Sequence, residues 1–148
     1  MALSTKQCIQ LNQSVFSLAN AYSSQMARER LPEQTGLTLS DRSTLMVLGQ
    51  ASRTTIRDLS KRMDINPGTV SVYVQRLVQL GLAKRIQSES DRRTWWLSLT
   101  EAGEEAHQDT INRAAQYTRA FLKSLAADEQ SMLHGLLIRV VKGLGYAW

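Results

Sequence analysis

The residues best suited to chemistry in this sequence are basic, and they are concentrated in one stretch. From Arg53 to Arg93 the chain carries nine lysines and arginines but only four acidic residues. That excess equals the net charge of +5 of the whole 148-residue chain. A concentrated basic segment is the electrostatic footprint of a polyanionic partner. Charge alone is equally consistent with a solvated basic face, so the elements that carry these residues decide between the two.

Two short helices joined by a tight turn are predicted within this stretch. Thr55-x-x-Asp58 is a capping-box pattern that starts the first helix, and Asp64-Ile65 make the turn. Asn66-Pro67 starts the second helix, because asparagine is a strong N-cap and proline suits the first helical position. Gly81 ends it as a left-handed C-terminal cap. In a helix-turn-helix of this kind the second helix enters the major groove of DNA.

The outward side of the second helix supplies the candidate DNA contacts. We expect Gln75 to pair with adenine, Arg76 to reach guanine or a phosphate, and Val72 to touch a thymine methyl group. Free N–H groups at the helix start can also hold a phosphate. The predicted DNA-binding residues of the two helices are Arg57, Pro67, Gly68, Thr69, Ser71, Val72, Gln75 and Arg76. The alternative is an ordinary amphipathic helix with a polar outer face.

A hairpin with a basic tip is predicted after the second helix. Residues 83–87 and 94–99 form its strands, and alternation places Trp95, Leu97 and Leu99 on one face. Arg92 and Arg93 at the tip can enter the minor groove, where A·T-rich DNA concentrates negative potential. Asp91 is expected to pair with one arginine and hold the other extended. Without the preceding helices, a solvated charged loop would explain this tip equally well.

Apolar stripes at helical spacing predict long helices on both sides of this stretch. The predicted helices cover residues 5–30 before a break at Leu31-Pro32, then Ser40 to about Ala51, Thr100 to about Leu125, and a last helix after Ala126-Ala127. The predicted fold is mainly α with a small β-hairpin: a winged helix-turn-helix with an α-helical dimerisation framework, in the order α-α-α-α-β-β-α-α.

The expected organisation has three parts. Residues 1–35 form an N-terminal dimerisation helix, residues 36–100 the winged helix-turn-helix DNA-binding region, and residues 101–148 the C-terminal dimerisation helices. The long helices cannot bury their stripes on the central part alone, so packing against a second copy is expected.

Five short motifs occur in a characteristic order: Gly68-Thr69-Val70-Ser71, Leu77-Val-Gln-Leu-Gly81-Leu82, Lys84-Arg85, Asp91-Arg92-Arg93 and Leu99-Thr100-Glu-Ala-Gly103. Together they resemble the MarR family of bacterial transcription regulators over residues 55–105. The resemblance implies a homodimeric repressor on a pseudo-palindromic operator, released by a small lipophilic or phenolic effector. It gives the wing role to Asp91 and Arg93, with Arg92 adjacent, and the base-reading role to Thr69, Ser71, Gln75 and Arg76. Val72 departs from the family pattern, in which arginine or another polar residue is common.

Other chemistry finds little support in the sequence. There is no nucleophile–base constellation and no glycine-rich phosphate loop, so we expect neither an enzyme nor a cofactor. His107 and His134 are too isolated for a metal site. Cys8 lies on an apolar stripe, which favours a buried structural thiol over a redox sensor.

The remaining expectations concern location and partners. A single cysteine, no secretory signal and no apolar run of bilayer length indicate a cytoplasmic protein without a membrane partner. Some bulky residues could line an effector cavity, although plain core is favoured for them: Tyr22, Met26, Met46, Trp95 and Tyr117. The competing function is a winged-helix module that docks an acidic protein, and a DNA-binding regulator without an effector is a second alternative.

Overall fold

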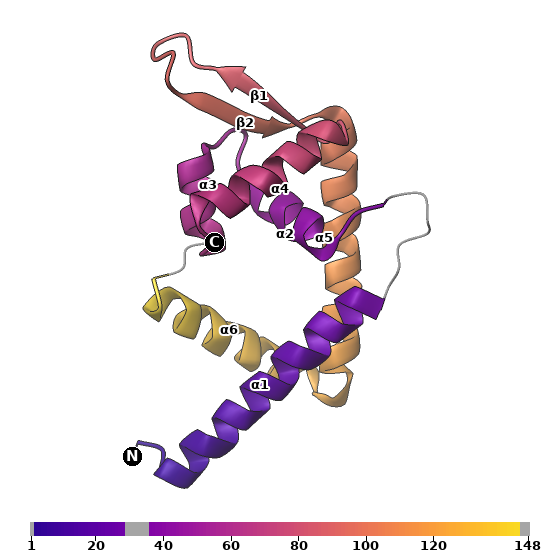
Figure 1. Cartoon of the computed structure of the whole chain (residues 1–148). Coiled ribbons are helices and arrows are strands. Elements are labelled where there is room, and N and C mark those ends of the chain that lie inside the picture. The colour runs from indigo at the N-terminus through magenta and orange to yellow at the C-terminus, as the bar shows by residue number, and fades with distance from the viewer. Residues whose placement is uncertain (1, 29–35, 146–148) are drawn as a thin grey trace. The chain divides into compact units, whose positions relative to one another are not determined.

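The computed structural model describes residues 2–28 and 36–145 (Figure 1). Its elements are α1 (Thr5–Arg28), α2 (Leu39–Leu48), α3 (Ile56–Met63), α4 (Pro67–Gln79), β1 (Ala83–Gln87), β2 (Trp95–Leu99), α5 (Glu101–Phe121), the 3-10 helix η1 (Leu122–Ser124) and α6 (Ala127–Gly143). The predicted fold class is confirmed. The chain forms two compact units, Met1–Leu39 and Ser40–Trp148. No helix within the described ranges is long and apolar enough to cross a membrane.

The first unit contains α1, which carries an exposed apolar stripe. Leu11, Val15 and Leu18 are each more than half exposed. The predicted burial of Cys8 is wrong for the single chain, because its thiol lies on this uncovered stripe and is exposed. The predicted break at Leu31-Pro32 lies outside the described residues.

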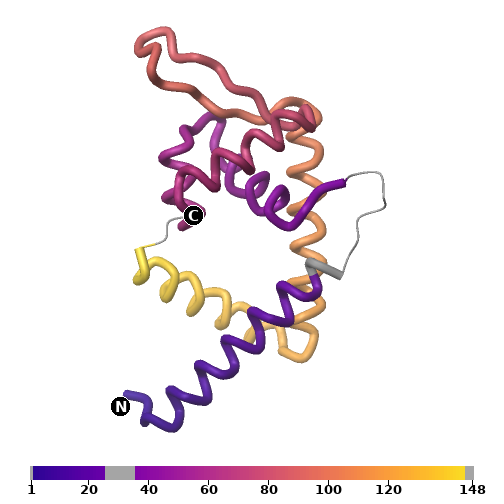
Figure 2. Tube along the Cα trace, viewed as in Figure 1, coloured from indigo at the N-terminus to yellow at the C-terminus, as the bar shows by residue number. Residues whose placement is uncertain are grey.

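The second unit is built around the helix-turn-helix, whose path is clearest in the tube of Figure 2. Its fully buried apolar side chains come from α2, α3, α4 and β2: Leu45, Leu48, Leu59, Val70, Val74, Leu77 and Leu97. Val70, Val74 and Leu77 therefore form the inner face of α4. Burying a residue of this size contributes about 1.5–3 kcal/mol, so this face fixes which side of α4 points outward.

The end of α2 lies close to α5. The helix ends at Leu48 rather than near Ala51, and a turn follows at Gly49-Gln50. A Cβ atom on Gly49 would lie 2.5 Å from the ring of the buried His107 in α5. A larger residue at position 49 would force the His107 ring to shift, so the contact explains why glycine fits there.

Thr100 and Gly103 join the wing to α5. The Thr100 hydroxyl accepts a hydrogen bond from the Gly103 N–H at 3.1 Å and donates one to the Gly81 carbonyl at 2.6 Å. A Cβ atom on Gly103 would lie 1.9 Å from the Leu82 carbonyl oxygen. The Leu-Thr-x-x-Gly motif is thus a three-way junction between the end of α4, the end of β2 and the start of α5.

Helix α5 ends earlier than predicted. Helix α5 stops at Phe121 rather than Leu125, because the chain tightens into η1, where the Leu125 N–H donates to the Leu122 carbonyl. Helix α6 exposes a row of large apolar side chains: Met132, Leu136, Leu137, Val140 and Leu144.

Candidate nucleic-acid interface

Side-chain caps start both helices of the helix-turn-helix. Thr55 Oγ1 accepts from the Asp58 N–H at 3.2 Å and donates to the Asp58 carboxylate at 2.8 Å, which starts α3. Asp64 ends α3 in the left-handed conformation, with φ of 53°. Asn66 Oδ1 then accepts from the Thr69 N–H at 2.9 Å, with Pro67 in the first turn of α4. These caps confirm the predicted turn and set the direction in which α4 leaves it.

The outer face of α4 combines uncharged polar side chains with one exposed apolar side chain, Val72. Val72 is 66% exposed, Gln75 is exposed, and Thr69 and Ser71 are half-buried. Pro67 and Gly68 are exposed at the helix start. A Cβ atom on Gly68 would lie only 3.3 Å from the Asn66 cap oxygen, so a larger residue would crowd the cap.

The Arg76 side chain of α4 forms hydrogen bonds within the protein. Its Nε donates to both carboxylate oxygens of Asp41 in α2, at 2.9 and 3.1 Å. Asp41 is fully buried, while the Arg76 side chain is 46% exposed. The sequence did not predict Asp41 as a partner of Arg76. The two residues are 35 positions apart, and no local pattern links them.

The hairpin has the predicted pairing. Ala83 pairs with Leu99, Arg85 with Leu97 and Gln87 with Trp95, in an antiparallel register. Backbone bonds between Thr54 and Leu97, at 2.7 and 2.9 Å, tie the hairpin to the segment before α3. On the other face of β2 the Arg53 guanidinium lies 4.6 Å from the centre of the Trp96 ring, a cation–π contact that supports the same attachment.

Asp91 organises the tip of the wing mainly through its turn. Its carboxylate accepts from the Arg93 N–H at 3.0 Å and from the Thr94 hydroxyl at 2.9 Å. The ion pair with Arg93 Nε is longer, at 4.0 Å, and the Arg93 side chain is 98% exposed. Gln87 Nε2 donates to the Arg92 carbonyl at 2.6 Å. The tip is therefore a fixed turn that leaves both arginines exposed to solvent.

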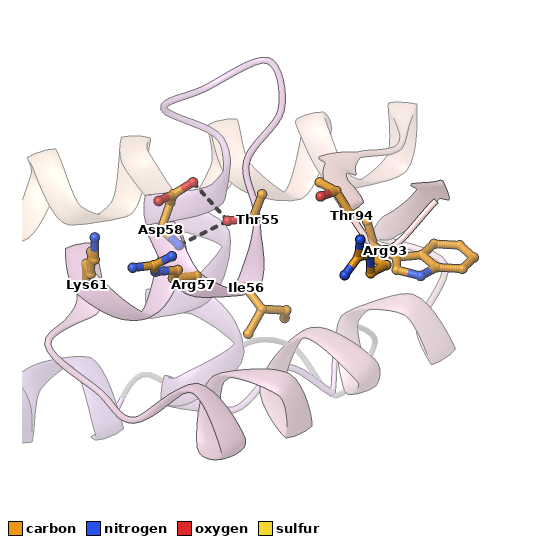
Figure 3. Close-up of a pocket in the computed structure, with 8 residues that line it drawn as sticks. Thr55, Ile56, Arg57, Asp58, Lys61, Arg93 and Thr94 are labelled. Atoms are coloured by element: carbon orange, nitrogen blue, oxygen red, sulfur yellow. Dashed lines mark hydrogen bonds between the residues drawn. The ribbon is translucent and has the colours of Figure 1, made fainter. Parts of the chain in front are cut away.

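A basic cleft lies between α3 and the wing (Figure 3). It has a volume of about 660 Å³ and is lined by Thr55, Ile56, Arg57, Asp58, Lys61, Arg93, Thr94 and Trp95. Figure 3 shows that α3 supplies Arg57, Asp58 and Lys61, whereas Arg93 and Thr94 come from the wing. The cleft thus joins Arg57 and Arg93, two predicted site residues that are 36 positions apart.

The sequence prediction included Arg57 and Arg93 and missed the other six cleft residues, among them Lys61 and Trp95. Lys61 follows Arg57 by one helical turn, which is the signal that could have placed both on one side of α3. Trp95 is 48% exposed, so the expectation that it is plain core is wrong. It continues the inward face of Leu97 and Leu99 past the edge of the core, where the hairpin extends beyond α3.

The other proposed cavity residues differ in exposure. Tyr117 is buried, Met46 is half-buried, and the side chain of Met26 lies outside the described residues. Among the residues that the structure describes, no group of three or more histidine, cysteine, aspartate or glutamate side chains is placed to hold a metal ion.

Comparison with known proteins agrees with this geometry. The model of the MarR family matches residues 35–94, which contain α2, α3, α4, β1 and the wing tip. The regulator MgrA of Staphylococcus aureus is 30% identical over 97 residues, which cover 66% of this chain and 65% of MgrA. This chain belongs to the MarR family.

Solved structures extend the likeness of this MarR family protein to nearly its full length. A MarR family protein from Bacillus stearothermophilus has a TM-score of 0.82 and 21% identity, covering 97% of this chain and 99% of that one. Streptococcus pneumoniae FabT, solved in complex with DNA, has a TM-score of 0.75 and 21% identity, covering 96% and 98%. At this identity the likeness shows a shared winged-helix fold.

Proposed function

We propose that this MarR family protein is a transcription regulator that binds double-stranded DNA in a sequence-specific way. The observation that carries the proposal is the placement of an exposed, doubly capped α4 beside the basic cleft and the Arg93 tip, all within one compact unit. The structural neighbour FabT was solved with DNA, which supports the same use of this fold.

The proposed contacts divide between three surfaces. The outer face of α4 enters the major groove, where Val72 touches a thymine methyl group and Gln75 pairs with adenine. Thr69, Ser71 and the helix start at Pro67-Gly68 contact bases or phosphates. The wing tip carries Arg92 and Arg93 into the adjacent minor groove, on the turn that Asp91 shapes.

The basic cleft has the chemistry of a phosphate site. Arg57, Lys61 and Arg93 supply three cations from two elements, and Thr94 supplies a hydroxyl group. A sugar–phosphate strand that runs between the major and minor grooves would pass between α4 and the wing. We infer that this cleft holds a backbone phosphate of that strand, with Lys61 as an additional contact.

The protein is proposed to act as a homodimer. Helix α1 exposes Leu11, Val15 and Leu18, and α6 exposes Leu136 and Val140. Rows of large apolar side chains of this kind mark interaction surfaces. A second copy is the simplest cover, because a twofold axis would present two α4 helices to half-sites about one DNA turn apart.

From the family resemblance we also propose that the protein represses transcription. A small lipophilic or phenolic effector would release it from DNA. The buried Tyr117 hydroxyl, which has no hydrogen-bond partner among the described residues, would suit a polar group of such an effector. A cytoplasmic location follows from this function.

Selection of duplexes from a random library by the purified protein tests the proposal. The expected result is enrichment of an inverted repeat whose half-sites are centred about 10 base pairs apart, or a multiple of one turn. Recovery of unrelated sequences after repeated rounds would refute sequence-specific binding. A reporter driven by the recovered operator then shows the sign of regulation.

A further inference from the structure

The Asp41–Arg76 pair is a buried ion pair under the outer face of α4. Asp41 lies in the first turn of α2 and is fully buried, and both of its carboxylate oxygens accept from Arg76 Nε. A buried carboxylate without a partner is strongly unfavourable, since it loses its hydration without compensation. The ion pair with Asp41 therefore holds the Arg76 side chain in place, whether or not DNA is present.

Arg76 is also the one charged residue in the sequence of α4. Residues Pro67–Gln79 read PGTVSVYVQRLVQ, with no lysine and no acidic residue. Because Arg76 is paired with Asp41, the face that includes Val72 and Gln75 presents no uncompensated charge. Exposed cations of the same unit belong instead to α3 and the hairpin: Arg57, Lys61, Lys84, Arg85, Arg92 and Arg93.

The position of the pair links it to the reading face. Arg76 is adjacent to Gln75 and lies one turn after Val72, so the three residues share one side of α4. The pair joins this side to α2 across 35 positions of sequence. A rotation of α4 about its axis would move Val72 and Gln75 and would also break both contacts to Asp41.

We propose that Arg76 is a positioning residue and makes no direct DNA contact: with Asp41 it fixes the rotation of α4 that presents Val72 and Gln75 to bases. This inference rests on the proposed DNA-binding function. On this assignment α4 supplies sequence discrimination almost without electrostatic attraction. The salt-dependent part of the affinity arises from α3 and the wing.

The salt dependence of DNA binding separates a positioning role from a phosphate contact. Asp41→Asn/Arg76→Gln removes both charges and keeps side chains that can hydrogen-bond each other. We expect this variant to retain the wild-type slope of log K against log[salt], while its preference at the base pairs read by Val72 and Gln75 falls at least about threefold. Arg93→Ala, the comparison variant, should reduce the magnitude of the slope by about two, because the proposed dimer loses one contact in each subunit.

A loss of about two units of slope in the double variant, one for each subunit of the proposed dimer, would overturn the inference, because it would show that Arg76 neutralises a phosphate. An unchanged base preference would overturn it as well. If the wild-type protein itself shows no salt-dependent duplex binding, the proposed function fails, and this assignment fails with it. An altered slope with intact wild-type binding would refute only the role of Arg76.

Thermal unfolding provides a second readout that needs no DNA. Arg76→Ala removes the guanidinium that faces the buried Asp41 carboxylate, so its melting temperature should fall at least about 6 °C below that of Asp41→Asn/Arg76→Gln. Equal melting temperatures would contradict the inference, since they would show that the buried Asp41 carboxylate does not need Arg76 for stability. If Arg76→Ala is too unstable to purify while the double variant folds, the dependence is confirmed.

Discussion

Gln75 is the residue of α4 with the greatest capacity to discriminate between bases. It is exposed, and its amide can donate to and accept from one adenine edge. We predict that Gln75→Ala relaxes preference at one operator position by about 1–3 kcal/mol and leaves the salt slope unchanged. Competition titrations with singly substituted duplexes measure this effect. Gln79→Ala, at the end of the same helix, is the matched control and should leave the preference intact; an equal loss for every operator base in Gln75→Ala would refute the reading role.

Lys61 tests the phosphate role of the basic cleft. Lys61→Ala should weaken binding to all duplexes alike and reduce the magnitude of the salt slope by about two, because one phosphate contact is lost in each subunit of the proposed dimer. Lys123→Ala removes the same charge from η1, outside the cleft, and should leave the slope unchanged. Equal slopes for Lys61→Ala and the wild type in anisotropy titrations would show that the cleft does not hold DNA.

At the residue scale, the sequence predicts local roles better than long-range partners. The caps Thr55, Asn66 and Thr100 were predictable, since each acts within three positions of itself. The partner of Arg76 was not predictable, because Asp41 lies on another helix. An aspartate at the start of a helix is already explained by its favourable interaction with the helix dipole. The exposure of Trp95 also depends on where the core ends, which strand alternation does not reveal.

At the scale of elements, the junction of Thr100 and Gly103 determines how the wing meets α5. Gly103→Ala would place a Cβ atom 1.9 Å from the Leu82 carbonyl oxygen, so the backbone must shift. We predict a loss of about 2 kcal/mol or more in the free energy of unfolding, as expected for overpacking at a buried site. Urea unfolding measures this loss.

Gly135→Ala is the matched control for that junction. Gly135 lies within α6, and a Cβ atom there has no neighbour within 4 Å, so alanine should change stability little or raise it by up to about 1 kcal/mol. A Gly103→Ala protein as stable as Gly135→Ala would contradict the close contact between α5 and Leu82.

Element boundaries were predictable where a cap defines them and less so elsewhere. Helices α3 and α4 begin where Thr55 and Asn66 predict, and Gly81 adopts the left-handed conformation with φ of 72°. The ends of α2 and α5 were predicted too late. One ends at a contact with His107 and the other tightens into η1, and neither event has a local sequence signal.

At the scale of the whole molecule, the apolar rows of α1 and α6 predict self-association. Leu136→Glu places a charge in the row of α6, which should shift the proposed dimer toward monomer at micromolar concentration because the charge would lose its hydration on assembly. Sedimentation equilibrium measures the change. Ser131→Glu introduces the same charge at an exposed polar position of the same helix and should leave the assembly intact. A wild-type protein that sediments as a monomer would refute the dimer.

The central claim is that this MarR family protein binds duplex DNA through α4, the basic cleft and the wing. Anisotropy titration of the selected inverted repeat and of a scrambled duplex, between 50 and 200 mM salt, tests it most directly. The predicted result is a loss of affinity of about 10³-fold or more across this range, and tighter binding to the repeat than to the scrambled duplex by a similar factor. Affinity that is the same for both duplexes and insensitive to salt would contradict the claim and favour a module that docks another protein.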